Sequence, residues 1–294
     1  LSMALATALV LAGWLPGAAR ATYQLSATAR SHAVSFLPLP GGAETDPQSL
    51  NLLNQPGAAT LQRLDTFADT TNGAATGLFL GRIGLLKAYA AADYARCCVD
   101  GATLLLGQAD ASVEGRFHDE VLVTGAGLAA GTPVSYQLVL RIGGTVSSPA
   151  FESGGNLSAN ALAEARLRDV TNGQEVSLGW DAARQATGLY TLSLPTVVGH
   201  TLSIQGMLSA SALVNAGAVI GRSAVVDFYH SAGFDLAPSV AGLNTTGASG
   251  TDFLAPVPEP GTAALWLCAL AALPLWRRLA WQPTPPTRSA TCTA

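Results

Sequence analysis

The chain has 294 residues with 49% hydrophobic, 12% charged and 6% aromatic side chains, and its formal net charge is −4. This composition excludes a highly charged disordered chain, and the absence of a basic block argues against a nucleic-acid partner. Glycine is abundant, with 31 residues, and no heptad pattern is present. Short strands and turns are therefore favoured over a helical bundle.

An apolar stretch opens the sequence and ends in small residues. The run MALATALVLAGWLPGAARA closes on Ala19-Arg20-Ala21, the small-x-small pattern that signal peptidase cleaves. We interpret residues 1–21 as a signal peptide with an apolar helix, which would carry the chain across the inner membrane and leave Thr22 as the first mature residue. The alternative is a retained membrane anchor, which the shortness of the stretch disfavours.

From residue 22 to residue 255 the dominant pattern is a period of two. In PVSYQLVLRIGG, Val134, Tyr136, Leu138 and Leu140 share one face, with the polar side chains near the other. Strands are expected at 22–36, twice within 102–127, and at 133–144, 160–170, 174–180, 188–198, 200–214 and 217–234. The segment 160–170 is ambiguous, since alanine favours helix, but its alternation and neighbours favour a strand.

Turn signals separate these segments. They are Gly143-Gly144, Asn172-Gly173, Gly199 and Gly221. Residues 38–62 are rich in turn formers and are expected to form a long loop or an insertion. Many strands at spacings near ten residues predict one all-β exported domain over residues 22–255, an antiparallel β-sandwich that is jelly-roll-like or Ig-like.

The last part of the chain combines a proline-rich motif, an apolar run and two arginines. The motif is Val257, Pro258, Glu259, Pro260, Gly261 and Thr262, and residues 261–276 carry no charge. Arg277 and Arg278 follow, a positive flank that stays on the cytoplasmic side. The run predicts one transmembrane helix, with residues 279–294 as a cytoplasmic tail. An ordinary C-terminal anchor and a buried core helix are the alternatives, and the uniformly apolar run disfavours the second.

These three parts in this order resemble the PEP-CTERM sorting signal of Gram-negative bacteria. Residues 256–278 match it, with Pro258, Glu259 and Pro260 as the motif core and Arg277 and Arg278 as the basic end. The resemblance implies recognition by an exosortase, transient residence in the inner membrane, removal of the tail, and delivery to the cell surface or the extracellular matrix. It also implies a link to exopolysaccharide and biofilm. The sequence departs from the family by extending sixteen residues beyond Arg278.

The exported body has a second, weaker resemblance to the β-rich region of PEP-CTERM proteins. Phe117, Asp119, Asp227 and Phe228 occupy the matching places, and the resemblance implies a structural role for them. Residues 22–256 hold 18 acidic and 11 basic side chains, a net charge of −7. This charge argues against nucleic acid and anionic polysaccharide as partners and leaves neutral glycans open.

Several groups of residues could carry chemistry, and each has a simpler interpretation. The groups are His118, Asp119 and Glu120 as metal ligands; Asp169, Asn172 and Glu175 as calcium ligands; Ser223, Asp227 and His230 as a nucleophilic set; and Asp100, Asp110 and Glu114 as glycosidase carboxylates. Strand alternation separates the first and third groups, a hairpin turn explains the second, and an acidic surface explains the fourth. The sequence therefore predicts no catalytic residue, metal or cofactor.

Aromatic and cysteine residues give little further information. Trp180, Tyr136, Tyr190 and Tyr229 could stack on sugars, but at these spacings most should pack in the core or at sheet edges. Cys97 and Cys98 are adjacent, which disfavours a disulfide between them. Two hypotheses follow: a non-enzymatic, exosortase-sorted surface or matrix protein, or a secreted carbohydrate-active hydrolase or neutral-glycan-binding module with the same signal. Two carboxylates and an exposed tryptophan in one groove would favour the hydrolase.

Overall fold

The computed structural model describes residues 23–36, 43–52, 61–70, 73–94, 106–147, 157–215 and 222–254. The chain divides into two compact units, residues 1–254 and 255–294, and all described residues belong to the first. Every regular element among them is a strand, and every strand pairing is antiparallel. The prediction of an all-β body with antiparallel sheets is confirmed.

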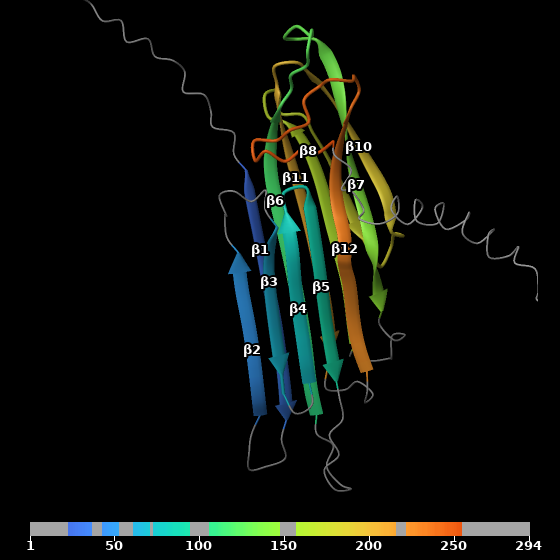
Figure 1. Ribbon diagram of the computed structural model, residues 1–294. Coiled ribbons are helices and arrows are strands. Elements are labelled where there is room, and N and C mark those ends of the chain that lie inside the picture. The colour runs from blue at the N-terminus through green and yellow to red at the C-terminus, as the bar shows by residue number, and fades with distance from the viewer. Residues whose placement is uncertain are drawn as a thin grey trace, which may run out of the picture. The chain divides into compact units, whose positions relative to one another are not determined.

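The twelve strands form two six-stranded sheets (Figure 1). The first sheet has the order β2 (Ala43–Leu52), β1 (Gln24–Phe36), β6 (Leu106–Leu122), β11 (Thr201–Val214), β8 (Leu157–Asp169) and β9 (Glu175–Asp181). The second has the order β10 (Gly188–Val197), β7 (Pro133–Ser147), β12 (Arg222–Pro238), β5 (Leu85–Tyr94), β4 (Gly73–Arg82) and β3 (Gln62–Asp69). The two sheets face each other across one continuous hydrophobic core.

The last eight strands pair in a nested way. Strand β5 pairs with β12, β6 with β11, β7 with β10, and β8 with β9. The chain from β5 to β12 thus behaves as one long hairpin whose successive pairs go alternately to the second and the first sheet. The pair β1 and β2 extends the first sheet beside β6, and β3 and β4 extend the second beside β5.

Small residues set the distance between the sheets in one half of the body. Gly73 of β4 faces Ala109 of β6, and a Cβ placed on Gly73 would lie 2.9 Å from the carbonyl oxygen of Gln108. In the other half the ring of Phe79 fills the space above Gly115, whose added Cβ would lie 2.1 Å from that ring. Glycine is therefore required at position 115, because the ring of Phe79 occupies the space that a side chain would take.

A polar bridge joins the two sheets at the end with small residues. The hydroxyl groups of Ser31 in β1 and Thr66 in β3 lie 2.8 Å apart, and that of Thr66 donates to the carbonyl of Gly77 at 3.3 Å. Both side chains are buried, so each needs these partners. The bridge therefore fixes how β1 and β3 stack.

The alternation expected in 133–144 is confirmed. Val134, Tyr136, Leu138 and Leu140 are all buried on the inner face of β7, and the strand expected at 160–170 is β8. The Asn172-Gly173 and Gly199 turns are also confirmed, with φ of 79° at Gly173 and 100° at Gly199. Gly221 lies outside the described residues.

Three expectations about the chain path were wrong. Residues 102–127 were expected to give two strands, but β6 is one strand of 17 residues, because its small and polar residues continue the alternation. Residues 38–62 were expected to form a long loop or an insertion, and the long-loop alternative is wrong, because β2 lies within them and pairs with β1 along its whole length despite Pro47. An edge strand tolerates this proline, since one side of it makes no ladder hydrogen bonds.

The third wrong expectation was a turn at Gly143-Gly144. The pair lies inside β7, opposite an irregularity of β12. There the four residue steps from Asp227 to Ser231 are matched by only two residue steps on β7, from Thr145 to Gly143. A Cβ on Gly144 would lie 2.5 Å from the carbonyl oxygen of Asp227. Glycine here makes room for a bulge rather than for a chain reversal.

Candidate functional site

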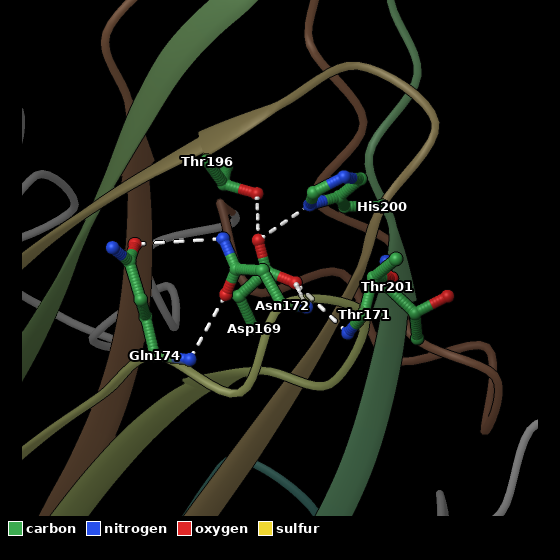
Figure 2. A network of polar contacts seen from close by, with 7 residues as sticks. All are labelled: Asp169, Thr171, Asn172, Gln174, Thr196, His200 and Thr201. Atoms are coloured by element: carbon green, nitrogen blue, oxygen red, sulfur yellow. Dashed lines mark hydrogen bonds and ion pairs between the residues drawn. The ribbon is translucent and has the colours of Figure 1, made fainter. Parts of the chain in front are cut away.

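A buried carboxylate at the end of β8 collects four hydrogen bonds (Figure 2). One oxygen of Asp169 accepts from the backbone N–H groups of Thr171 at 2.9 Å and Asn172 at 3.2 Å. The other accepts from the hydroxyl of Thr196 at 2.6 Å and from Nδ1 of His200 at 2.7 Å. Because an ionised carboxylate only accepts, Nδ1 of His200 carries the proton in this pair.

The charge of Asp169 is stabilised by these donors. Burial raises the pKa of the carboxyl, but the hydrogen bonds from Thr196, His200, Asn172 and Thr171 outweigh burial and hold the pKa below its ordinary value. The donors come from the turn after β8, from Thr196 near the end of β10 and from His200 between β10 and β11. The network therefore ties two chain reversals together at one end of the body.

The arrangement does not form the calcium site considered from the sequence. The side-chain oxygen of Asn172 accepts from the N–H of Gln174 at 2.9 Å, and Glu175 faces Arg166 at 3.4 Å. Among the residues that the structure describes, no group of three His, Cys, Asp or Glu could hold a metal ion. The hairpin-turn interpretation of these residues agrees with the geometry.

A second buried carboxylate anchors residues 239–254, which we call the cap segment. Asp119 of β6 accepts from the hydroxyl of Ser249 at 2.6 Å, from the N–H of Ser249 at 3.2 Å and from the N–H of Glu120 at 2.9 Å. Burial raises the pKa of Asp119, and these hydrogen bonds offset only part of the rise. Elsewhere in the cap segment the ring of Phe253 packs beside that of Phe117, with centroids 6.4 Å apart.

The remaining candidate sets are distributed rather than gathered. His118 and Glu120 lie on the outer face of β6, 4.0 Å apart, while Asp119 points into the body. Asp110 bonds to His32 at 3.0 Å, and Glu114 bonds to Arg116 at 2.6 Å. Ser223 and Asp227 lie on the outer face of β12, two rows apart. Asp100, Cys97, Cys98 and the side chain of His230 lie outside the described residues.

The aromatic candidates divide between core and surface. Trp180 is 2% exposed and Tyr136 is fully buried, as the core interpretation predicts. The hydroxyl of Tyr190 donates to the carbonyl of Ala186, which also accepts from the indole N–H of Trp180. Tyr229 lies on the outer face of the second sheet, with Nζ of Lys87 over its ring at 5.7 Å from the centroid.

Other aromatic and apolar side chains share that outer face. We call it the aromatic face: the outward residues of β3, β4, β5 and β12, which stand side by side in Figure 1. Its members include Arg63, Asp65, Phe67, Leu78, Leu80, Lys87, Tyr89, Asp227 and Tyr229. Phe67 and Tyr89 were not among the residues expected to stack on sugars, because no strand was expected between residues 61 and 94, although alternation there could have revealed them.

The outer face of the first sheet has a different character. It carries two shallow depressions of about 190 and 310 Å³ that share Glu164 and Met207. The smaller is flanked by Arg116 and Arg166, each bonded to a glutamate. Among the outward positions of this sheet whose side chains the structure describes, none is a Phe, Tyr or Trp.

The predicted processing residues lie outside the described part of the chain. They are Ala19 and Ala21 at the signal cleavage position, Val257, Pro258, Glu259, Pro260, Gly261 and Thr262 in the sorting motif, and Arg277 and Arg278 at the basic end. The predicted terminal helices lie outside it too. Among the described residues, no helix has the length and apolar character needed to cross a membrane.

Comparisons with known proteins return no relative. No family model, no curated protein and no solved structure matches this chain.

Proposed function

We propose that this chain is an exported, non-enzymatic protein of the cell surface or extracellular matrix, sorted by an exosortase and linked to exopolysaccharide or biofilm. The observation that carries the proposal is the ordered set of a signal-peptide pattern, the motif at 257–262, an uncharged run and Arg277-Arg278. Signal peptidase and the exosortase are its processing partners. The inner membrane holds the chain until the tail is removed, by the same logic as a lipid-anchor signal.

We further propose that the body is a β-sandwich of the jelly-roll kind rather than the Ig-like kind. The nested pairing of β5 with β12, β6 with β11, β7 with β10 and β8 with β9 supports this classification, since a jelly roll folds one long hairpin into two sheets. The pairs β1–β2 and β3–β4 would then be additions at one side. Such a fold by itself indicates no activity.

The environment of the charged side chains supports a non-enzymatic role. The hydrolase alternative asked for two carboxylates and an exposed tryptophan in one groove. Trp180 is buried, and Asp110 and Glu114 are each bonded to a separate basic side chain. The two strongly bonded carboxylates, Asp119 and Asp169, hold a cap segment and two turns in place. These hydrogen bonds explain why both carboxylates are buried, and no catalytic role is needed to explain them.

Intact mass of the protein in membrane and medium fractions tests the proposal. In a host with its exosortase, we expect a product that has lost residues 1–21 and the segment from about Pro260 onward. In a host that lacks the exosortase, the tail should remain. Glu259→Ala should prevent removal of the tail, whereas Glu175→Ala, on the exposed edge of the body, should be processed normally. An uncleaved tail in both hosts would refute sorting and establish an ordinary one-span anchor.

A further inference from the structure

The two outer faces of the body differ in their aromatic content. On the aromatic face, Tyr89 and Tyr229 are half-buried and Phe67 is 58% exposed. The outer face of the first sheet has mainly arginine, glutamate and serine on its central strands, together with the non-aromatic Met207 and Leu162. Scattered apolar residues on a surface need no explanation, but rings gathered on one face of two do.

Strand register places these rings in successive rows. Phe67 pairs with Thr76, and Asp65 and Leu78 lie in the next row with Tyr89. Tyr89 in turn pairs with Asp227 of β12. Ordinary strand spacing puts the Cα atoms of Phe67 and Tyr89 about 12 Å apart, a distance that an extended oligosaccharide bridges.

The third ring, Tyr229, lies on this face beside the irregular stretch of β12. Tyr229 follows Asp227 in the irregular stretch, and its N–H donates to the Asp227 carboxylate at 3.0 Å. Lys87 lies over the ring, with its Nζ 5.7 Å from the ring centroid. Residues two apart in a strand point to the same side, so Tyr229 shares the outer face with Asp227.

Carboxylates border the rings, and two cations of this face, Arg63 and Lys87, already have partners. Arg63 donates to both oxygens of Asp65 at 2.9 and 2.6 Å, and Lys87 is held by Tyr229. Burial raises the pKa of Tyr89, and the charges of Asp93 and Asp227 add to the rise. Asp227 pairs with Tyr89 across β5 and β12. The face therefore offers rings and hydrogen-bond acceptors side by side.

We propose that the aromatic face binds a neutral, hydroxyl-rich polysaccharide, with Tyr229, Tyr89 and Phe67 as stacking positions and Asp65 and Asp227 as acceptors for its hydroxyl groups. The polysaccharide partner rests on the proposed delivery of the chain to the matrix. A sugar ring has apolar C–H faces that pack on aromatic rings and hydroxyl groups that donate to carboxylates, so it satisfies both kinds of group at once.

Other occupants satisfy only part of this surface. A polyanion would meet the carboxylates of Asp65, Asp93 and Asp227 and a body with a net charge of −7. An apolar protein surface, such as a second copy of this chain, would cover those carboxylates without giving them donors, which costs free energy. The mixture of rings and carboxylates thus favours a neutral glycan.

Affinity electrophoresis of the purified full-length chain in mild detergent tests the proposal. The gels contain hydroxyethyl cellulose or dextran as neutral probes, or alginate as an anionic probe. We expect retardation by a neutral probe and none by alginate. Tyr229→Ala and Tyr89→Ala should each weaken retardation about tenfold, the ratio that corresponds to the loss of roughly 55 Å² of apolar contact. Tyr89→Phe, which keeps the ring, should retain most of the binding.

Two controls keep the result interpretable. Leu162→Ala removes a 40% exposed apolar side chain from the other outer face and should leave retardation unchanged. Urea unfolding of each variant shows whether it is folded. Four outcomes would each overturn the proposal. Neither neutral probe retards the chain, the ring variants are retarded as strongly as wild type, alginate alone retards the chain, or the rings mediate dimers in place of glycan binding. None of these outcomes depends on tail removal, so failure of the sorting proposal is detected separately by the intact mass.

Discussion

Replacing Asp169 by alanine should be among the more damaging single changes to the body. The substitution leaves the N–H groups of Thr171 and Asn172, the hydroxyl of Thr196 and Nδ1–H of His200 without their acceptor. At about 0.5–1.5 kcal/mol per net hydrogen bond, and with a charged acceptor among them, the loss is about 3–5 kcal/mol. Against a total unfolding free energy of about 5–15 kcal/mol, this is a large fraction.

Urea denaturation followed by intrinsic tryptophan fluorescence measures this loss. With a slope of about 2–3 kcal/mol per molar urea, the midpoint should fall by about 1–2.5 M. Asp169→Asn serves as the matched variant, because its amide oxygen still accepts from Thr171 and Asn172 while its NH₂ group accepts from neither Thr196 nor His200. It should lose about half as much. A midpoint change below about 0.3 M for Asp169→Ala would refute the network as a source of stability.

The same carboxylate predicts a dependence on pH. Because its folded pKa is lowered, its contribution is complete above the ordinary value of about 3.9 and is lost as the pH falls through the lowered folded value. The difference in unfolding free energy between wild type and Asp169→Asn should therefore shrink below about pH 4. A difference that stays constant from pH 7 down to pH 3 would contradict the assignment.

Three further changes test the packing and the cap segment. Gly115→Ala places a Cβ against the ring of Phe79 and should lower the unfolding free energy by about 1–3 kcal/mol. Phe79→Leu in the double variant should partly restore it. If the effects of the two single substitutions simply add in urea titrations of the double variant, this would count against the contact. Asp119→Ala should lose about 2–3 kcal/mol and expose the cap segment to proteolysis. Asp119→Asn should have only a mild effect on the unfolding free energy. Because the folded pKa of Asp119 is raised, the unfolding free energy of this variant should increase relative to that of wild type as the pH rises through the raised folded value. A decrease relative to wild type over that pH range would refute this. Tyr136→Phe removes one hydrogen bond to the cap segment and should cost about 0.5–1.5 kcal/mol in thermal or urea unfolding, whereas a stabilised variant would contradict the bond.

The sequence alone determined the local geometry of most strands. Alternation in residues 133–142 fixed which side chains of β7 are buried, and Asn172-Gly173 fixed a reversal that only a residue with positive φ makes easily. The same reasoning misplaced Gly143-Gly144, because a glycine that makes room for a neighbouring strand looks like a glycine that turns the chain. The neighbour, the bulged part of β12, is more than 80 residues away in the sequence.

The tertiary structure decided which of these strands meet. Asp169 finds Thr196 and His200 at separations of 27 and 31 residues, and the aromatic face joins Phe67, Tyr89 and Tyr229 from three separate strands. A period of two tells which way a side chain points but not which strand lies beside it, since pairing depends on long-range contacts summed over the whole core. Individual side chains were therefore predictable as buried or exposed, whereas their assembly into networks and faces was not.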